Sequence, residues 1–526
     1  MAVTDPRVVI VGAGMAGLVS ALQIARRGVP VTVVEASQAP GGKVRQLQVA
    51  GVAIDSGPTV FTMRWIFDQV LASVGTRLED ELRITPLSVL ARHFWDPDLA
   101  QGEVATLDLH ADPRASQDAV ARFAGPEEAR RFATFCAQAR EVYQALEGPF
   151  IRSTSPTMAR MVGDLGLHGL SVLTRLGPMR NLWDCLGRHF TDPRLRQLFG
   201  RYATYCGSSP WQAPATLMLI AQVEMDGVWA VEGGMHALAR MLERLARAQG
   251  VVFRYGAACE RIEITAGRAS GVILAGGERI EAQRVVFNGD VAALAGGLLG
   301  EPARAASPRV APRSLSALTW SMHTRTHGLP LDRHNVFFTG DYRSEFADIF
   351  GHGRLPRRPT VYLCAQDRGT GTPDNGAPQR LLTLVNAPAV GGQDRLTPEA
   401  LDECEHHSFS LMRRCGLALQ PQAHESVRQT PDDFHRLFPG TGGALYGQAT
   451  HGWNSAFARS PATSPVPGLF LAGGSVHPGP GVPMAAMSGQ LAAAAVMDSL
   501  ASTSRSRPGA TSGGTSMRSA TTATTA

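Results

Sequence analysis

The sequence predicts an α/β protein that is built around a parallel sheet, and three observations lead to this prediction. A β-branched run at 7–11 is followed by the glycine turn Gly12-Ala-Gly14-Met-Ala-Gly17, a helical pattern and a second strand at 31–35. This order of elements fills the roughly 30 residues of a βαβ unit. Another strand runs into glycines near the other end, at 468–474. The chain has 526 residues, 44% of them hydrophobic, which is enough for about two to four domains.

Composition excludes several classes of protein. The seven cysteines are scattered and never spaced as C-x-x-C, so neither a disulfide framework nor a metal site is expected, and a reduced, cytoplasmic compartment suits the chain. No basic region or cleavage site of a signal peptide precedes the first apolar run. Residues 501–526 are rich in Ser, Thr, Gly and Ala and predict a disordered tail.

The first glycine turn has the spacing of a phosphate-binding site. Gly12 permits a tight turn, Gly14 lets backbone N–H groups approach a pyrophosphate, and Gly17 allows close packing of helix on strand. The helix N-terminus then faces the anion. Glu35, at the end of the second strand, is placed to accept hydrogen bonds from an adenosine ribose. A lone G-x-G-x-x-G motif is weak evidence for nucleotide binding. Here the strand before it and the helix after it predict that the turn binds a dinucleotide.

The residues that follow decide between NAD and FAD, which the glycine turn alone leaves open. Glu35 is followed by Gly41-Gly42-Lys43 and Arg45, which resembles the extended FAD fingerprint of the amine-oxidase and phytoene-desaturase flavoproteins. In that fingerprint, two glycines let the backbone pass close to the cofactor, and Lys43 or Arg45 can neutralise phosphate charge. The turn that follows resembles the family's D-x-G-P turn beside the flavin; its residues are Asp55, Gly57, Pro58 and Thr59.

A second glycine turn near the end of the chain completes the predicted cofactor site. A strand runs into Gly473 and Gly474, and a helix of small residues, ending near residue 500, follows a proline. A helix that begins this way makes a second site for negative charge. In flavoenzymes of this type the helix faces the N1/O2 edge of the flavin. Many relatives carry an acidic residue where Gly474 stands. The residues expected to contact FAD here are Gly473, Gly474, Gly481, Val482, Pro483 and Met484.

The motifs divide the chain into segments. A Rossmann-like FAD-binding domain is expected from 1–90, 231–300 and 455–500, with an α+β substrate domain inserted at 91–230 and 301–454. From Ile151 to Ala203 there are eight arginines and three aspartates, with leucines at helical spacing between them. Such basic amphipathic helices suit an anionic membrane surface, although an ordinary helix packing its leucines inward has the same pattern. No nucleic-acid-binding motif accompanies the charge.

Two further stretches narrow the resemblance. Ala-Arg-His-Phe-Trp at 91–95 and Arg-Tyr-Ala-Thr-Tyr-Cys-Gly-Ser-Ser-Pro at 201–210 are similar to the phytoene desaturase-type carotenoid oxidoreductases, most of all to the 1-hydroxycarotenoid 3,4-desaturases of purple bacteria. The resemblance implies an acyclic hydroxylated carotenoid substrate, desaturated at C3–C4 by hydride transfer from C4 to FAD and loss of a proton from C3. It also implies peripheral attachment to the inner membrane and electron transfer to oxygen or a quinone-like acceptor.

The residues that would act on the substrate are less well defined. Candidate general bases are His93, His236, Asp55, Glu224 and Asp226, each by residue type alone. Arg92 and His93 are our candidates for recognising the 1-hydroxyl. Three alternatives stay open: phytoene or neurosporene desaturation or another carotenoid oxidation or isomerisation, amine oxidation, and a flavin-binding membrane protein without turnover.

Overall fold

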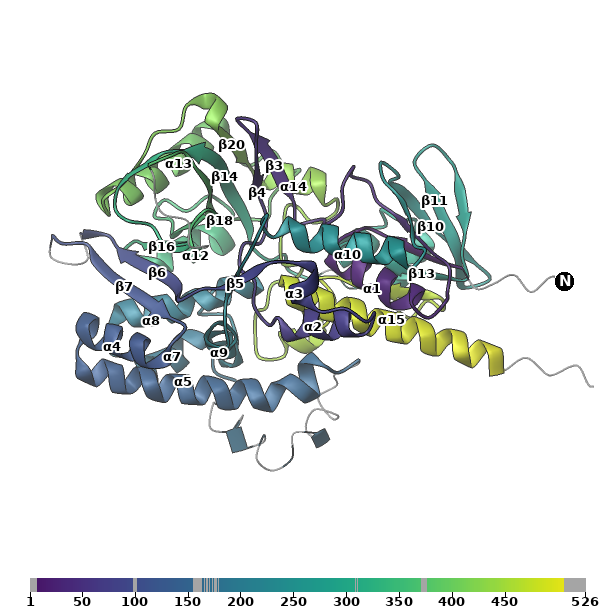
Figure 1. Cartoon of the computed structure of the whole chain (residues 1–526), viewed down its shortest axis with the longest axis horizontal. Coiled ribbons are helices and arrows are strands. Elements are labelled where there is room, and N and C mark those ends of the chain that lie inside the picture. The colour runs from purple at the N-terminus through teal and green to yellow at the C-terminus, as the bar shows by residue number, and fades with distance from the viewer. Residues whose placement is uncertain are drawn as a thin grey trace, which may run out of the picture.

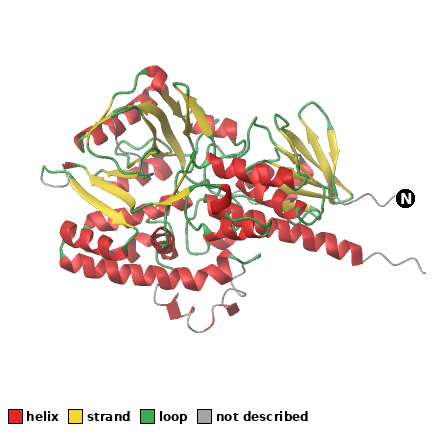
Figure 2. Cartoon of the chain, in the orientation of Figure 1, coloured by secondary structure: helices red, strands yellow, loops and turns green. Residues whose placement is uncertain are grey.

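The computed structural model describes residues 7–505, apart from 98–101, 155–162, 165, 167, 168, 170, 173, 175, 176, 178, 308, 310 and 370–375. Its long axis joins two lobes (Figure 1). One lobe contains a parallel sheet and holds the first and last described segments of the chain. The other contains a larger mixed sheet with a layer of helices beneath it. Figure 2 shows that both lobes contain strands and helices and that helices lie along the lower side of the molecule.

The parallel sheet confirms the predicted fold class. Its five strands are parallel throughout and lie, in spatial order, as β21 (Leu469–Leu471), β13 (Arg284–Phe287), β1 (Val8–Val11), β2 (Val31–Val34) and β9 (Val252–Arg254). Strands from both ends of the chain and from its middle are therefore neighbours. Because side chains alternate along a strand, Val8 and Ile10 face one core of the lobe and Val9 and Val11 the other.

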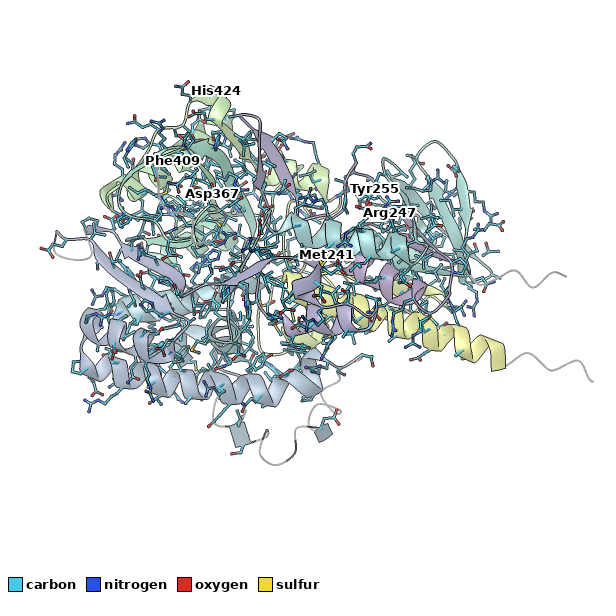
Figure 3. The ribbon with its side chains drawn as sticks, in the orientation of Figure 1. Met241, Arg247, Tyr255, Asp367, Phe409 and His424 are labelled. Atoms are coloured by element: carbon cyan, nitrogen blue, oxygen red, sulfur yellow. The ribbon has the colours of Figure 1, made fainter. Side chains whose placement is uncertain are left out.

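Each face of this sheet is covered by a different layer. Helices α1 (Met15–Ala25), α10 (His236–Ala248) and α15 (Val482–Arg505) pack together on one face, and α2 (Trp65–Ala72) lies against α15. The other face carries a small antiparallel sheet of β10 (Cys259–Thr265), β11 (Arg268–Leu274) and β12 (Arg279–Glu281). At the end of α10, Arg247 stacks on Phe253 and Tyr255, with Met241 inside the core (Figure 3).

Helix α15 is longer than we predicted. It begins at Val482 and runs through Arg505, past the expected boundary at residue 500. Ala, Met, Leu and Ser dominate its sequence, and none of these breaks a helix. The rest of the predicted tail lies outside the described residues.

The second lobe is built on one sheet to which both insertions contribute. Strands β6 (Val89–Trp95) and β7 (Ala105–His110) come from the first insertion. Among the described ladders of this mixed sheet, only the β6–β16 pair is parallel, and this pair joins the two insertions. The second insertion supplies, in spatial order, β20 (Ser426–Gln429), β14 (Ser316–Thr324), β18 (Gln379–Ala387), β17 (Val361–Ala365) and β16 (His334–Phe338).

Short hairpins and helices connect and cover the two lobes. Helix α13 (Pro398–Arg414) covers one face of the mixed sheet. The hairpin of β3 (Gln46–Val49) and β4 (Val52–Asp55) contacts β14. The other short elements of this kind are α3 (Leu78–Glu81), β5 (Ile84–Pro86), η2 (Glu147–Ile151), β8 (Trp229–Val231), α11 (Val291–Ala295), η5 (Glu301–Ala306), β15 (Thr326–Gly328), α12 (Tyr342–Phe346), η6 (Ala347–His352), β19 (Leu417–Leu419), η7 (Ala423–Glu425), α14 (Pro431–Leu437) and η8 (Ser455–Ala458).

A layer of helices covers the other face of the mixed sheet, and its packing favours the second reading of the basic segment. Leu182, Leu186 and Phe190 are buried in the core that this layer shares with β6 and β7. Helix α7 and Phe190 therefore pack their apolar side chains inward, whereas Met179 is exposed, and the leucines between 165 and 176 lie outside the described residues. The layer contains α4 (Pro113–Ala124), α5 (Pro126–Leu146), α7 (Leu182–His189), α8 (Pro193–Gly200), η3 (Arg201–Cys206), η4 (Ala215–Met218) and α9 (Leu219–Met225).

None of the helices in the described ranges is both long enough and apolar enough to span a bilayer.

One carboxylate of the second lobe is buried and forms no ion pair with any residue that the structure describes. Glu345 on α12 has no exposed surface and accepts hydrogen bonds from the backbone and hydroxyl of Thr360 and from the amide of Asn386. Burial raises the pKa of Glu345 to about 7, against the opposing effect of these hydrogen bonds. The native state therefore binds a proton that the unfolded chain releases near pH 4.5.

We expect this carboxylate to make folding stability fall as the pH rises from about 4.5 to about 7. Replacing Glu345 with Gln removes the titration but keeps the shape. Urea unfolding at pH 5 and pH 8 measures the free energy of unfolding of wild type and of Glu345→Gln. Relative to wild type, the variant should be more stable at pH 8 than at pH 5. The same difference in unfolding free energy at both pH values would contradict the prediction.

Candidate flavin site

The first glycine turn is as closely packed as its spacing predicts. Gly12 has a φ of +100°, and a Cβ on Gly17 would lie 2.1 Å from the carbonyl oxygen of Gly12. The N–H of Ala13 donates to Oε2 of Glu35 at 2.6 Å, which ties the turn to the end of β2. Helix α1 then begins without an acidic residue in its first turn and without a side-chain cap. A helix end of this kind suits an anion.

The second pair of predicted glycines lies directly against this turn. The N–H of Gly41 donates to the carbonyl of Ala13, and Gly14 and Gly41 form an isolated parallel bridge. A Cβ on Gly42 would come within 3.2 Å of the Cα of Gly14. The sequence separates these two glycine pairs by a strand and a helix, and the fold brings them into contact.

The glycine turn near the end of the chain meets the first one, as predicted. Gly473 follows β21, and helix α15 starts after Gly481, at the same edge of the sheet where α1 starts. The two helices touch, because the hydroxyl of Ser20 donates to the carbonyl of Gly489 and a Cβ on Gly489 would clash with Ala16. Ligands of open parallel sheets bind at this carboxyl edge. Gly474, Pro483 and Met484 lie in the turn and in the first turn of α15.

A residue that we did not predict holds the turns together. Asn288 follows β13, accepts the N–H of Gly17 at 2.8 Å on its Oδ1, and donates from Nδ2 to the carbonyl of Ala472 at 3.1 Å. A Cβ on Gly14 would come within 2.9 Å of the same Oδ1, and one on Gly473 within 3.0 Å of Nδ2. The only sequence signal was a polar residue at the end of a buried strand.

The two predicted cations lie inside the protein. Nζ of Lys43 donates to the carbonyl of Leu445 at 2.6 Å and lies over the ring of Phe438. Burial lowers the pKa of Lys43, and the charge of Asp290 partly opposes this shift. Arg45 donates to the side chain of Gln429. Contact of either cation with a phosphate stays a prediction.

Hydrogen bonds to Asp55 hold the first residue of the predicted D-x-G-P turn in place. Asp55 accepts the backbone N–H groups of Met235 and His236 and so caps the start of α10. A Cβ on Gly57 would lie 1.9 Å from the carbonyl of Lys43, which places this turn against the G-G-K segment. Pro58 is exposed, and the hydroxyl of Thr59 shares a hydrogen bond of 2.6 Å with Oη of Tyr362.

Most of the candidate bases have other partners. Asp55 is the helix cap just described, the ring of His236 bonds the carbonyl of Pro40, and Asp226 accepts the amide of Gln222. Glu224 accepts the hydroxyls of Tyr202 and Tyr205; burial raises its pKa, and these hydrogen bonds and the charge of Arg201 oppose the shift.

The two candidates for hydroxyl recognition lie on β6, away from the glycine turns. Arg92 forms a bidentate pair with Asp108 on the neighbouring strand and donates to the carbonyl of Pro330, so we expect a structural role for it. His93 is buried, bonds the carbonyl of Leu107 and stacks on Phe338. Burial lowers the pKa of His93 to about 3, which keeps the ring neutral at physiological pH.

A group of side chains between the D-x-G-P turn and the final glycine turn lies deep in the molecule yet keeps part of its accessible surface. We infer from this surface that the group borders an internal space. Tyr446 connects this space to the final glycine turn, because Arg459 donates both to its carbonyl and to that of Gly474. These lining residues are Lys43, Arg201, Tyr205, Cys206, Tyr362 and Tyr446.

Comparison with known proteins identifies the cofactor that these glycine turns bind. The family model of flavin containing amine oxidoreductases matches residues 15–497. The chain belongs to this family. It is thus an FAD-dependent oxidoreductase, as the glycine pattern predicted. The hydroxyneurosporene desaturase of Rubrivivax gelatinosus is 61% identical to it, over 98% of both chains. The 1-hydroxycarotenoid 3,4-desaturase of a Flavobacterium strain is 27% identical, over 93% of this chain and 98% of its own.

Solved structures agree on the flavoprotein fold. The cyclohexylamine oxidase of Brevibacterium oxydans matches with a TM-score of 0.57 at 17% identity, over 95% of this chain and 100% of its own. The residues of this family member also fit the cofactor. Added Cβ atoms at Gly14 and Gly42 would crowd the surface where the two loops meet, and two helix N-termini converge there. Glu35 accepts three hydrogen bonds, one from Ala13 and two from Ser37, which leaves about one of the roughly four acceptor positions of a carboxylate for a ribose.

Replacing Asn288 with Ala should weaken FAD binding and stability together. The change leaves the N–H of Gly17 and the carbonyl of Ala472 without their partner, at a cost of about 2 kcal/mol or more. Flavin content by absorbance and the Tm by calorimetry measure the two effects. Asn454→Ala, at an exposed asparagine, is the matched control. Full flavin occupancy and an unchanged Tm in Asn288→Ala would show that this amide does not hold the site.

Proposed function

We propose that this protein desaturates the C3–C4 bond of an acyclic carotenoid that carries a hydroxyl at C1. The observation that carries the proposal is the 61% identity, over nearly the whole of both chains, to a protein named hydroxyneurosporene desaturase. The 1-hydroxycarotenoid 3,4-desaturase among the relatives supports the position of the new double bond. The internal space beside the flavin turns supports a substrate that is enclosed by the protein.

FAD, when bound, supplies the chemistry of the reaction by accepting the hydride that leaves C4. The residues of the chain enclose the reacting carbons: the D-x-G-P turn borders the space through Thr59 and Tyr362, and the final glycine turn through Tyr446. Enclosure excludes water from the reacting carbons. Burial of the polyene's apolar surface in the protein favours binding by about 25 cal/mol for each Å² removed from water.

Removal of the C3 proton does not call for a strong base. Loss of hydride from C4 leaves positive charge that the conjugated chain spreads, which makes the C3 proton acidic. The structure gives Asp55, His236, Glu224 and Asp226 other hydrogen-bond partners, and His93 is buried within the second lobe. We therefore assign no general base among these five.

Purified protein with FAD should convert 1-hydroxyneurosporene in liposomes into a product with one more conjugated double bond. The longer polyene absorbs at longer wavelength, so absorbance and mass loss of two hydrogens measure the reaction. Gly17→Ala, whose Cβ would meet the carbonyl of Gly12, should lack flavin and turnover; Gly148→Ala, at an open and exposed glycine, is its control. Conversion of phytoene or neurosporene alone would favour a different carotenoid desaturase, and oxidation of an amine would favour an amine oxidase. Bound flavin with no turnover would favour a flavin-binding membrane protein.

We further propose that the protein works at an anionic membrane surface and passes its electrons to oxygen or a quinone-like acceptor. A water-insoluble substrate must be taken from lipid, and the arginines between 151 and 203 other than the buried Arg201 suit anionic headgroups.

Flotation with vesicles tests the membrane proposal. Binding to phosphatidylglycerol vesicles should exceed binding to neutral phosphatidylcholine vesicles and should weaken as salt is raised, because salt screens exposed charges. Equal flotation with both vesicles, or none, would contradict it. Flavin reoxidation rates with oxygen and with a soluble quinone distinguish the two acceptors.

A further inference from the structure

Arg201 lies deep inside the protein at the start of η3, close to the flavin turns. Its side chain keeps part of its accessible surface, which faces the internal space defined above. The guanidinium lies over the rings of Tyr205 and Tyr362, at 5.1 and 5.4 Å from their centroids. Two aromatic faces therefore hold this cation by cation–π contacts.

Most of the hydrogen-bond donors of Arg201 have no protein partner. A guanidinium carries five N–H donors. Among the described residues, Arg201 makes one hydrogen bond, from Nη1 to Oη of Tyr205 at 3.1 Å. The nearby buried Arg459 differs, because its two terminal nitrogens donate to three carbonyls and a hydroxyl. Buried donors are almost always satisfied, so those of Arg201 are available to a ligand or to water.

The charge of Arg201 already has a counterion, which favours a neutral ligand. Tyr205 links Arg201 to Glu224, since its hydroxyl donates to Oε1 of Glu224 at 2.8 Å. Tyr202 donates to the other carboxylate oxygen at 2.7 Å. The described carboxylates leave Arg201 without a direct salt bridge, so Glu224 balances its charge through this tyrosine. A site with balanced charge and spare N–H donors suits an uncharged oxygen acceptor.

The position of Arg201 agrees with the distance that such a substrate requires. Tyr362, which stacks on Arg201, is hydrogen-bonded to Thr59 of the D-x-G-P turn. In the proposed substrate, C1 is three carbon–carbon bonds from C4, or about 4 Å. A hydroxyl on C1 must therefore bind close to the flavin, among the residues that border this turn.

We propose that the guanidinium of Arg201, held by Tyr205 and Tyr362, donates hydrogen bonds to the C1 hydroxyl and selects hydroxylated carotenoids. This inference rests on the proposed function and adds the residue that recognises the hydroxylated end of the carotenoid. Arg201 is a positioning and specificity residue, and it takes no part in moving the hydride or the proton. It replaces Arg92 and His93, our candidates from the sequence.

A competition assay tests the proposal with holoenzyme. Liposomes that contain equal amounts of 1-hydroxyneurosporene and neurosporene are incubated with wild type or with Arg201→Met, which keeps an unbranched side chain but has no donor. The ratio of the two products cancels differences in membrane binding and in flavin content. Loss of a charged hydrogen bond should reduce the preference for the hydroxylated carotenoid by about tenfold or more.

Two further variants separate recognition from structure. Arg92→Met removes an arginine of the second lobe that is paired with Asp108, and it should lower the Tm without changing the product ratio. Tyr205→Phe frees Arg201 from Glu224 with little change of shape, and it should reduce the preference less than Arg201→Met does. It also provides the test if Arg201→Met does not fold.

The outcomes are distinct. Equal loss on both carotenoids in Arg201→Met, or an unchanged ratio in both Arg201→Met and Tyr205→Phe, would overturn the role of Arg201 alone. Failure of flavin-loaded wild type to convert either carotenoid would overturn the proposed function.

Discussion

The flavin site depends on one side-chain amide. Asn288 donates to the strand that precedes the last glycine turn and accepts from the helix that follows the first one. An amide suits this place, because it is a donor and an acceptor at once and both of its partners are backbone groups. The glycines around it are required for the same reason, since added Cβ atoms at Gly14 and Gly17 would press on the Oδ1 of Asn288.

The second lobe extends this arrangement toward the substrate. Neither insertion could form the mixed sheet alone, because β6 and β7 come from one insertion and the other strands from the next. The internal space lies where η3 of the first insertion meets β17 of the second. Apart from Lys43, the side chains around this space come from the insertions, so we attribute substrate choice to the insertions.

The sequence predicted best what is local. The first strand, turn, helix and strand were confirmed because their pattern lies within 30 residues, and the two glycine turns were expected to meet because both end strands with the same geometry. Asn288 was missed because its partners are 271 and 184 positions away. The leucines of α7 were open to two readings, since a lipid surface and a protein core both require an apolar face. Arg92 was a candidate because sequence alone does not show that Asp108 already occupies its donors.

The contact between Ser20 and Gly489 has a consequence for biosynthesis. A ribosome adds about 5–20 residues each second, so the nascent N-terminal helix waits for tens of seconds before its partner from the far end of the chain is made. Until then the side of that helix that faces α15 and the edge of β13 that pairs with β21 have no partner. The two glycine turns therefore come together only when nearly the whole chain has been made.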